Sequence, residues 1–483
     1  MKRIACILAP LVFGACNVGP TYERPKLVHA PSGAFKENTQ GSEDAQEGGW
    51  RQASPSDEKI RGKWWEIFGE PELSTLEERL VLDNQNIKQS FENYMAARAA
   101  MRAATAQLYP QIGVGASATE TGKSSGLTSL FALPLTVTWE PDLFSKIRNT
   151  IKQAANNAQL SSATLANVAL SEQVSLAQIY FQLRGQDALL DLYAGTIANY
   201  KESLRLVQVL ARTGIDSEQE VAQAEVTLHT AEANMSAIVT TRSQFEHAIA
   251  LLVGEVAGSF SLAPRPIEVH VPAVPIAVPS RLLERRPDIA AAERSMAAAN
   301  ALIGVGKAAY YPDISLSAGI GTQADNLSKL FSTGANYWSL GGSASEKIID
   351  FGGRRATVAQ YEAQYRATVA AYRQTALNAF KEVEDYLVAS RQLFEQAQRQ
   401  KRAVESAERY EKLANIRYKT GVDTYLNVIT AQTNLLSSRQ ALVSVATNQM
   451  TTAVHLVGSV GGGWSTEKLP TEGDVSRGAP SLP

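Results

Sequence analysis

The sequence predicts a mostly α-helical protein that also supplies strands to a transmembrane β-barrel, with both parts built from a helix-strand-strand-helix unit that occurs twice. Three observations predict this fold class. Four short motifs recur in the same order about two hundred residues apart. Two proline-free stretches of helix-forming residues are too long for a compact globular domain. Four short segments alternate apolar and polar side chains, as strands with one oily and one wet face do.

The first element is an export signal over residues 1–15. Basic residues precede an apolar stretch that ends at Gly14 and Ala15, and the stretch is too short to span a membrane as a helix. Cys16 follows these two small residues, as a bacterial lipoprotein peptidase requires, because the thiol of the new first residue must carry diacylglycerol. We therefore expect a covalent lipid on Cys16. The alternative is an ordinary cleavage site beside a stray cysteine.

Composition excludes several classes of protein. Cys6 and Cys16 are the only cysteines, so the mature chain forms no internal disulfide and its stability depends on packing and assembly. After the signal, no apolar run reaches the length of about 18 residues that a spanning helix needs, so any membrane crossing must use a barrel. The formal charge is −2, and basic residues are scattered along helical stretches, which argues against nucleic acid as a partner.

Four landmarks define the repeat. Each unit has a Tyr-Pro pair before its first alternating segment, an aspartate turn after its second, a Thr-Gly-x-Asp turn after its long helix, and a closing Leu-Val-Gly. The pairs begin at Tyr109 and Tyr311, at Asp142 and Asp350, at Thr213 and Thr420, and at Leu252 and Leu456. One shared motif could arise by chance, but four in order indicate a duplication.

The longest elements are helices over 145–212 and 354–419, which are rich in Ala, Gln, Glu, Leu and Arg. At 1.5 Å per residue each spans on the order of 100 Å. Uninterrupted runs of this length are typical of coiled coils and helical barrels.

The alternating segments lie at 112–119 and 131–140 in the first unit and at 314–321 and 338–345 in the second. A tryptophan lies near one end in each unit, as in barrel strands that cross a bilayer. A soluble half-buried sheet shows the same alternation and is the alternative. Four strands cannot close a channel, because small barrels already need about eight, so a barrel requires several copies of the chain.

These residues make the chain similar to the TolC-like outer-membrane factors, and within them to the lipoprotein (NodT-like) branch that serves resistance-nodulation-division (RND) efflux pumps. The resemblance covers nearly the whole mature chain. Its most specific motifs lie at 16–22, 64–68, 139–144, 282–293 and 310–314.

The resemblance implies a homotrimer with a twelve-stranded barrel in the outer membrane and a twelve-helix tunnel across the periplasm. It implies a passive exit duct, lipid-anchored to the outer membrane, for substrates delivered by an inner-membrane RND transporter and a periplasmic adaptor (membrane fusion protein). No cofactor is expected besides the lipid on Cys16, and no metal. Drugs, solvents, metal ions and secreted metabolites all remain open as cargo.

The expected organisation follows from these assignments. It comprises a signal at 1–15, a lipidated extension at 16–62, a first repeat at 63–262, a proline-rich equatorial link at 263–280, a second repeat at 281–460 and a tail at 461–483. Within the repeats, the strands fall at about 111–140 and 313–350, and the helical tips at about 213–220 and 420–427.

The tips carry the candidate site. Gly214 and Gly421 are expected to end the long helices in the left-handed conformation. Asp216 or Ser217, and Asp423 or Thr424, then cap the returning helices, and capping alone already explains these residue types. The resemblance implies that both turns lie at the periplasmic tip, where the duct closes and meets the adaptor.

The resemblance also implies a latch at the tip, with Tyr418 and Glu220 on one pair of contacting positions. A hydrogen bond to a charged group contributes about 1.5–3 kcal/mol, so a ring of them could be broken by adaptor binding. The chain departs from the branch at Thr430 and Asn427, which replace residues that are acidic in other members. These two positions therefore supply no carboxylates to an acidic ring.

Two other functions were weighed. An enzyme is disfavoured, because the five histidines show no metal-ligand spacing and Gly304-Val305-Gly306 lies in a helical context that does not suit a nucleotide loop. A periplasmic coiled-coil scaffold lipoprotein explains Cys16 and the long helices. It does not explain four alternating strands placed symmetrically in two repeats.

Overall fold

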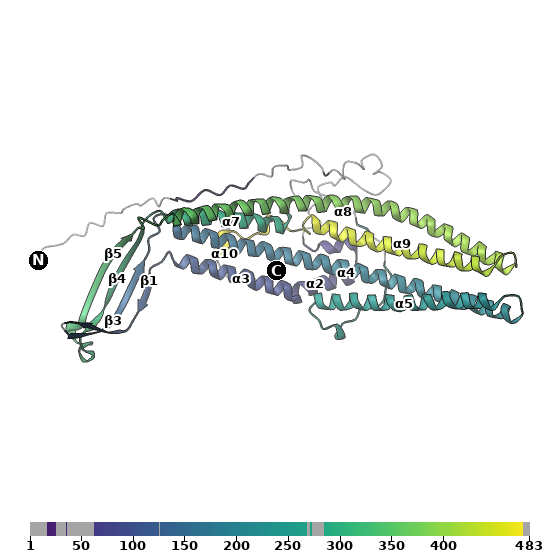
Figure 1. Cartoon of the computed structure of the whole chain (residues 1–483), viewed down its shortest axis with the longest axis horizontal. Coiled ribbons are helices and arrows are strands. Elements are labelled where there is room, and N and C mark those ends of the chain that lie inside the picture. The colour runs from purple at the N-terminus through teal and green to yellow at the C-terminus, as the bar shows by residue number, and fades with distance from the viewer. Residues whose placement is uncertain are drawn as a thin grey trace.

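The computed structural model describes residues 17–25, 35, 62–124, 126–267, 271–272 and 285–476. The predicted signal, Cys16 and most of the 263–280 link lie outside the described residues. The molecule is elongated, with a sheet at one end, helices running side by side along its length, and two helical turns at the other end (Figure 1).

From α3 in the first half and α7 in the second, the two halves repeat one order of elements. The first half comprises η2 (Trp64–Phe68), α2 (Pro71–Asp83), α3 (Gln85–Ala106), β1 (Gln111–Val114), β2 (Ser117–Lys123), β3 (Gly126–Trp139), α4 (Lys146–Arg212) and α5 (Glu218–Leu252). The second comprises α7 (Pro287–Ala308), β4 (Asp313–Ala324), β5 (Asn336–Ser345), α8 (Gly353–Lys419) and α9 (Tyr425–Ser459). A short helix, α10 (Glu472–Ser476), follows. Helix α7 therefore corresponds to α3, and β4 and β5 to the strands of the first half.

Helices α4 and α8 have 67 residues each, which confirms the two long helices predicted from the sequence. The repeated aspartate turn starts both of them. Asp142 accepts hydrogen bonds from the backbone N–H groups of residues 147 and 148 at 3.0 and 2.9 Å, and Asp350 accepts from those of residues 352 and 354 at 3.1 and 3.0 Å. These N–H groups have no partner inside the helix, so a carboxylate there stabilises its start.

The strands form one antiparallel sheet in the order β1-β3-β4-β5, with β2 also paired to β3. Strands β1 and β2 hold a single register against β3 and together make up the one strand predicted there. The ladder is interrupted opposite Pro134, which has no N–H to donate, although its carbonyl still accepts from Gly115 at 2.9 Å. Within the sheet, the strands of the two halves meet where β3 pairs with β4.

The sheet has one apolar and one polar face, as predicted. Exposed apolar side chains such as Ile320, Trp338 and Leu340 alternate with small polar ones. On the polar face the hydroxyls of Ser315 and Ser343 lie 2.9 Å apart across the ladder. None of the helices in the described ranges is long and apolar enough to cross a membrane.

The main core lies midway along the helices, where α2 packs on α4. The Trp64-Trp65-Phe68 motif is buried in it, and Phe68 contacts Phe181 with ring centroids 5.2 Å apart. Next to this core, the Asp187 carboxylate binds two guanidinium groups, of Arg184 at 2.7 Å and of Arg242 at 2.6 Å. This buried network fixes α4 to α5 and to the chain that leaves α5, because Arg242 also donates to the Leu262 carbonyl at 2.6 Å.

Helix α7 lies between α4 and α8, and its glycines allow close approach. A Cβ on Gly304 would lie 2.6 Å from the Asn149 side chain of α4, and one on Gly306 would lie 2.9 Å from the Tyr361 ring of α8. Gly304 and Gly306, whose helical context does not suit a nucleotide loop, therefore allow close packing of α7 against its neighbours.

Candidate functional site

Both turns at the helical end are closed by glycine, as predicted. Gly214 has φ 75° and Gly421 has φ 72°. The Gly214 N–H donates to the Ala211 carbonyl at 3.0 Å and the next N–H, of Ile215, to the Leu210 carbonyl at 3.0 Å. This two-bond pattern is the Schellman motif, and the second turn repeats it.

The returning helices begin at different caps. In the first turn Ser217 is the N-cap of α5, and Glu220 accepts from its backbone N–H at 2.8 Å. In the second turn Thr424 is the N-cap of α9, and its N–H donates to Asp423 at 2.9 Å. Glu220 and Asp423 are thus engaged with the starts of their own helices.

Tyr418 joins the two hairpins, but its partner differs from the expected one. Its hydroxyl, near the end of α8, donates to the carboxylate of Asp216 in the turn between α4 and α5. In the structure Tyr418 does not bond the predicted partner Glu220, whose carboxylate instead accepts from the Ser217 backbone N–H and hydroxyl. Burial raises the pKa of the Tyr418 hydroxyl well above its ordinary value, and the bond to Asp216 raises it further, so the hydroxyl stays a donor at neutral pH.

The Tyr418–Asp216 bond lies beside an apolar cluster. Tyr418 is buried against Tyr425, with ring centroids 5.2 Å apart, and against Val207, Ala224 and Val428. Tyr418 is buried and Asp216 is partly buried, so the hydroxyl–carboxylate bond is better shielded from water than an exposed one.

A second set of charges holds the α8–α9 turn. The Asp423 carboxylate accepts from Arg417 at 3.1 Å and from the side-chain amide of Asn427. These bonds lower the pKa of Asp423, with the Asn427 bond making the largest contribution. The sequence analysis missed Arg417, although a basic residue in the last turn of a helix is a readable signal.

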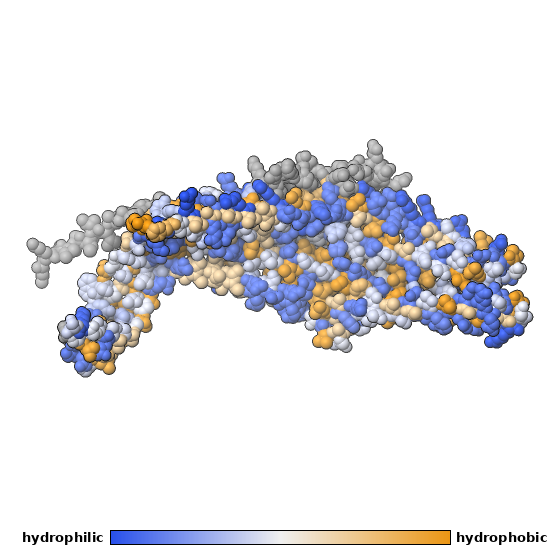
Figure 2. Space-filling model, viewed as in Figure 1, coloured by the Kyte–Doolittle hydropathy of each residue, from blue (hydrophilic) through white to orange (hydrophobic). Residues whose placement is uncertain are grey.

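Thr430 lies exposed on α9, with its hydroxyl bonded to the Leu426 carbonyl at 2.9 Å. The ends of both turns carry apolar side chains in solvent, including Ile215 at 71% and Val422 at 65% exposure. Figure 2 shows such hydrophobic residues among hydrophilic ones at this end of the molecule. The tip therefore combines a polar bond between its two hairpins with exposed apolar side chains.

At the opposite end, residues 17–25 lie along α7 beside the junction of strands and helices. Asn17 accepts from the Asn149 amide at 3.2 Å, and a Cβ on Gly19 would lie 2.9 Å from the Cα of Gly304. Further along, the Tyr22 hydroxyl donates to Glu293 at 2.6 Å. These contacts fix the start of the described chain near the first turn of α4, next to the sheet.

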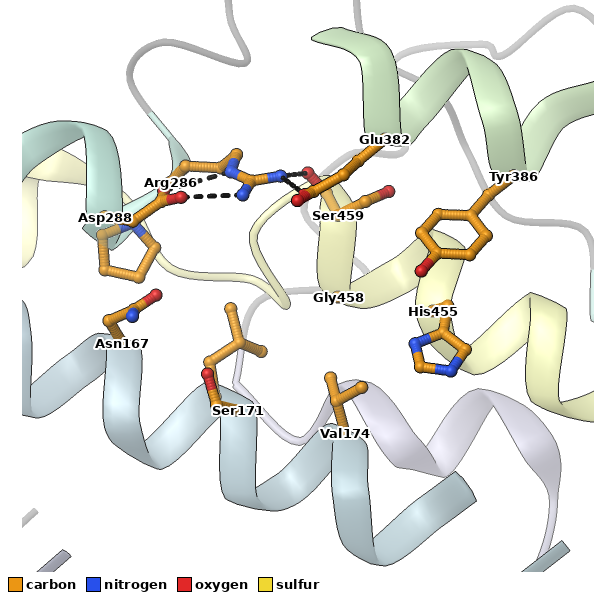
Figure 3. Close-up of a pocket in the computed structure, with 12 residues that line it drawn as sticks. Asn167, Ser171, Val174, Arg286, Asp288, Glu382, Tyr386, His455, Gly458 and Ser459 are labelled. Atoms are coloured by element: carbon orange, nitrogen blue, oxygen red, sulfur yellow. Dashed lines mark hydrogen bonds and ion pairs between the residues drawn. The ribbon is translucent and has the colours of Figure 1, made fainter. Parts of the chain in front are cut away.

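One polar cavity of about 310 Å³ lies between α4, α7, α8 and α9 (Figure 3). Its charges are matched internally. Arg286 is bonded to Asp288 at 2.7 Å, to Glu382 at 2.7 Å and to the Ser459 carbonyl at 3.0 Å. His455 stacks on Tyr386 with centroids 5.2 Å apart, and burial lowers its pKa. This arrangement ties α7 to α8 and α9, and the described part of the chain contains no cluster suited to a metal ion.

Comparison with known proteins decides what kind of molecule this is. The sequence profile of the outer membrane efflux protein family matches residues 78–255 and 278–462. The chain belongs to this family. The antibiotic efflux pump outer membrane protein ArpC of Pseudomonas putida is 30% identical over 478 residues, covering 95% of each chain. The solvent efflux pump outer membrane protein SrpC of the same species is 31% identical over 471 residues, covering 96% of this chain and 98% of SrpC.

The fold agrees with this membership. The solved structure of the outer-membrane channel OprN superposes with a TM-score of 0.85 at 29% identity, covering 93% of this chain and all of OprN. Members of the outer membrane efflux protein family are transport channels, and this chain is the outer-membrane channel of a tripartite efflux pump. A coiled-coil scaffold accounts neither for this membership nor for the sheet.

Proposed function

We propose that the protein acts as a lipid-anchored homotrimer that forms the exit duct for substrates delivered by a periplasmic adaptor and an inner-membrane RND transporter. The observation that carries the proposal is the open sheet. Strand β5 and the β1–β2 strand each have one edge without a strand partner in the described chain. Lipid cannot satisfy the backbone N–H and C=O groups of such edges, so a sheet of this kind must close with further copies.

The position of the N-terminal segment supports the lipid anchor. Asn17 lies beside Asn149, where the helical part meets the sheet. A residue joined to Asn17 that carries acyl chains would place them next to the end of the barrel strands, at the depth of one membrane leaflet. Two acyl chains and a barrel together give firmer attachment than either alone.

The tip supports docking of an adaptor. It lies at the end of the molecule opposite the sheet (Figure 1), so a channel held by its strands in the outer membrane presents this end to the periplasm. Exposed Ile215, Val422 and Leu426 give it an apolar surface of the kind that marks protein contacts.

The cargo does not follow from similarity. ArpC and SrpC are about equally similar to this chain, and one is an antibiotic and the other a solvent efflux protein. We propose no cofactor beyond the lipid, since a passive duct needs none.

Light scattering of the protein in mild detergent, with the detergent mass subtracted, tests the assembly. The expected mass is that of three chains, and the same sample should insert into planar bilayers and conduct. A monodisperse monomer, or a trimer that never conducts, would overturn the proposal.

A further inference from the structure

Because the chain is duplicated, residues that make contacts between the two halves have equivalents at the two open edges of the sheet, on β5 and on the β1–β2 strand. At the junction of strands and helices the two halves meet through an aromatic stack. Phe144, directly before the N-cap of α4, lies against Tyr311 in the turn from α7 to β4, with ring centroids 4.5 Å apart and planes inclined by 17°. Phe144 is thereby partly buried, and Tyr311 is 41% exposed.

The equivalent aromatic residues have no such cover. Phe351 lies directly before Gly352, the N-cap of α8, and is 99% exposed. Tyr109, in the turn from α3 to β1, is 65% exposed. Phe351 also has φ 51°, a left-handed conformation that costs a residue other than glycine about 1 kcal/mol or more. A strained, fully exposed aromatic residue indicates a contact that a single chain does not complete.

The strand registers extend the same argument to the sheet. Gln111 lies opposite Thr138 in the first half, as Asp313 lies opposite Ser345 in the second, so these pairs are equivalent. Between the halves, Val137 lies opposite Ala318. Counting along the equivalent strands, Val137 corresponds to Ala344 and Ala318 to Ala116.

We propose that the open edges bind a second copy of this chain, with Phe351 of one copy stacked on Tyr109 of the next and Ala344 directly opposite Ala116. The inference rests on the proposed trimer and specifies its seam. It repeats between chains the contact that β3 and β4 make within one chain.

The side chains along this register are compatible. Trp338 falls opposite Gly122 of the next copy, just as Phe131 falls opposite Ala324 within the chain, so a large ring covers a small residue in both cases. On the polar face Ser343 falls opposite Ser117, which repeats the polar lining of the internal junction. No like charges oppose each other between Ala116 and Gly122.

Cysteine pairs test the register. Directly opposite residues have Cα atoms close enough for a disulfide, whereas diagonal neighbours about 7–8 Å apart do not meet that need. Ala344→Cys is combined in turn with Val114→Cys, Ala116→Cys and Ala118→Cys in the full-length chain, and oxidation is followed on non-reducing gels. We expect covalent dimers and trimers with Ala116→Cys and with neither neighbour.

Matched controls separate the possible failures. Val137→Cys with Ala318→Cys has the same geometry within one chain and should lose free thiols without a change of mass, while each single variant should form no cross-link. Cross-linking through residue 114 or 118 instead would overturn the register. No cross-link in a protein that light scattering shows to be trimeric would overturn the seam but not the trimer, and a monomer would overturn both.

A double-mutant cycle tests the stack. Phe351→Ala and Tyr109→Ala should each lower the temperature at which trimers dissociate, and the double variant should lower it no further than the larger single effect, because the two rings contact each other. Phe331→Ala removes a similarly exposed ring, 81% accessible, from the other end of the sheet and should leave that temperature unchanged. Additive effects of Phe351→Ala and Tyr109→Ala would show that the rings face lipid rather than each other.

Discussion

The hydroxyl of Tyr418 joins the two hairpins of one chain at the Asp216 carboxylate, and we propose that this bond helps to keep the channel closed. Removing it with Tyr418→Phe keeps the ring in its apolar cluster and lets Asp216 be solvated. A bond of this type contributes about 1.5–3 kcal/mol, so the open probability in planar bilayers should rise about tenfold or more. Asp216→Asn should act in the same direction.

Glu220→Gln is the matched control for that experiment. A glutamine still accepts from the Ser217 N–H, so the cap on α5 is kept and the channel should behave as the unaltered protein does. If Glu220→Gln opens the channel and Asp216→Asn does not, Tyr418 is paired with Glu220 in the assembled tip and the contact within the chain is not the latch.

Tyr418 was expected to bond Glu220 and instead bonds Asp216, which shows what a sequence motif can and cannot predict about single residues. The resemblance selected Tyr418, which does bond across the two hairpins. Ser217 with Glu220 three residues later is itself the sequence pattern of a capping box. That local role occupies Glu220. The position of Asp216 relative to Tyr418 depends on how two hairpins some two hundred residues apart pack together, which no local pattern specifies.

Glu77 is a buried carboxyl group whose protonation should affect stability. It is fully buried, and neither carboxylate oxygen has a hydrogen-bond partner within the described chain. Burial therefore raises its pKa well above 4.5. Between pH 4.5 and that raised pKa the unfolded chain releases the proton while the folded chain retains it, so stability falls as pH rises, by about 1.4 kcal/mol per pH unit.

We expect Glu77→Leu to raise the melting temperature, and to raise it more at pH 7 than at pH 5, in thermal unfolding followed by circular dichroism. Glu78→Gln, which alters an exposed ion pair with Lys63, should change the melting temperature little at either pH. An equal gain from Glu77→Leu at both values would mean that Glu77 is ionised in the folded protein.

At the scale of elements, close packing of α7 rather than helix propensity decides which glycines can be replaced. Gly304→Ala would bring a methyl group within 2.6–3.0 Å of the Asn149 amide, so Asn149 must move and release Asn17. Gly195 lies in α4 with nothing within 4 Å of an added Cβ. We expect Gly195→Ala to stabilise the protein by about 0.5–1 kcal/mol in denaturant unfolding and Gly304→Ala to destabilise it. Stabilisation by both would show that α7 is loosely packed.

The elements themselves were largely predictable, because long helices and alternating strands have strong periodic signals. The alternation over 112–119 predicted one strand, and the interruption of this strand opposite Pro134 depends on the partner strand. The buried network around Asp187 also escaped prediction, since it joins residues from α4, α5 and the following chain.

At the scale of the whole molecule, the duplication explains why one chain forms a continuous sheet and helical layer but leaves both edges of the sheet open. The second half packs on the first through α7 and β4, which contact α4 and β3. The equivalent surfaces of α3, β1 and β2 in the first half have no such neighbour within the described chain. The family and the fold could be predicted from the sequence because the landmarks recur in order. The contacts that close the tube could not, because their geometry appears only once the two halves are superposed.

In the proposed assembly, a lipid on Cys16 contributes to attachment to the membrane, and Cys16 directly precedes Asn17 in the sequence. Because Asn17 lies at the junction of helices and sheet, acyl chains on Cys16 would enter the leaflet beside the strands and give each chain one anchor, or three per trimer. We expect Cys16→Ser to abolish incorporation of radioactive palmitate and to lower the amount of protein in the outer membrane, while the molecules that arrive still form trimers, since the strands are unchanged. Cys6→Ser, which alters the only other cysteine, should keep the label. Palmitate on the Cys16→Ser protein would show that the lipid is attached at another residue. A mature chain that starts at another residue would show that Cys16 is not the lipidated N-terminus.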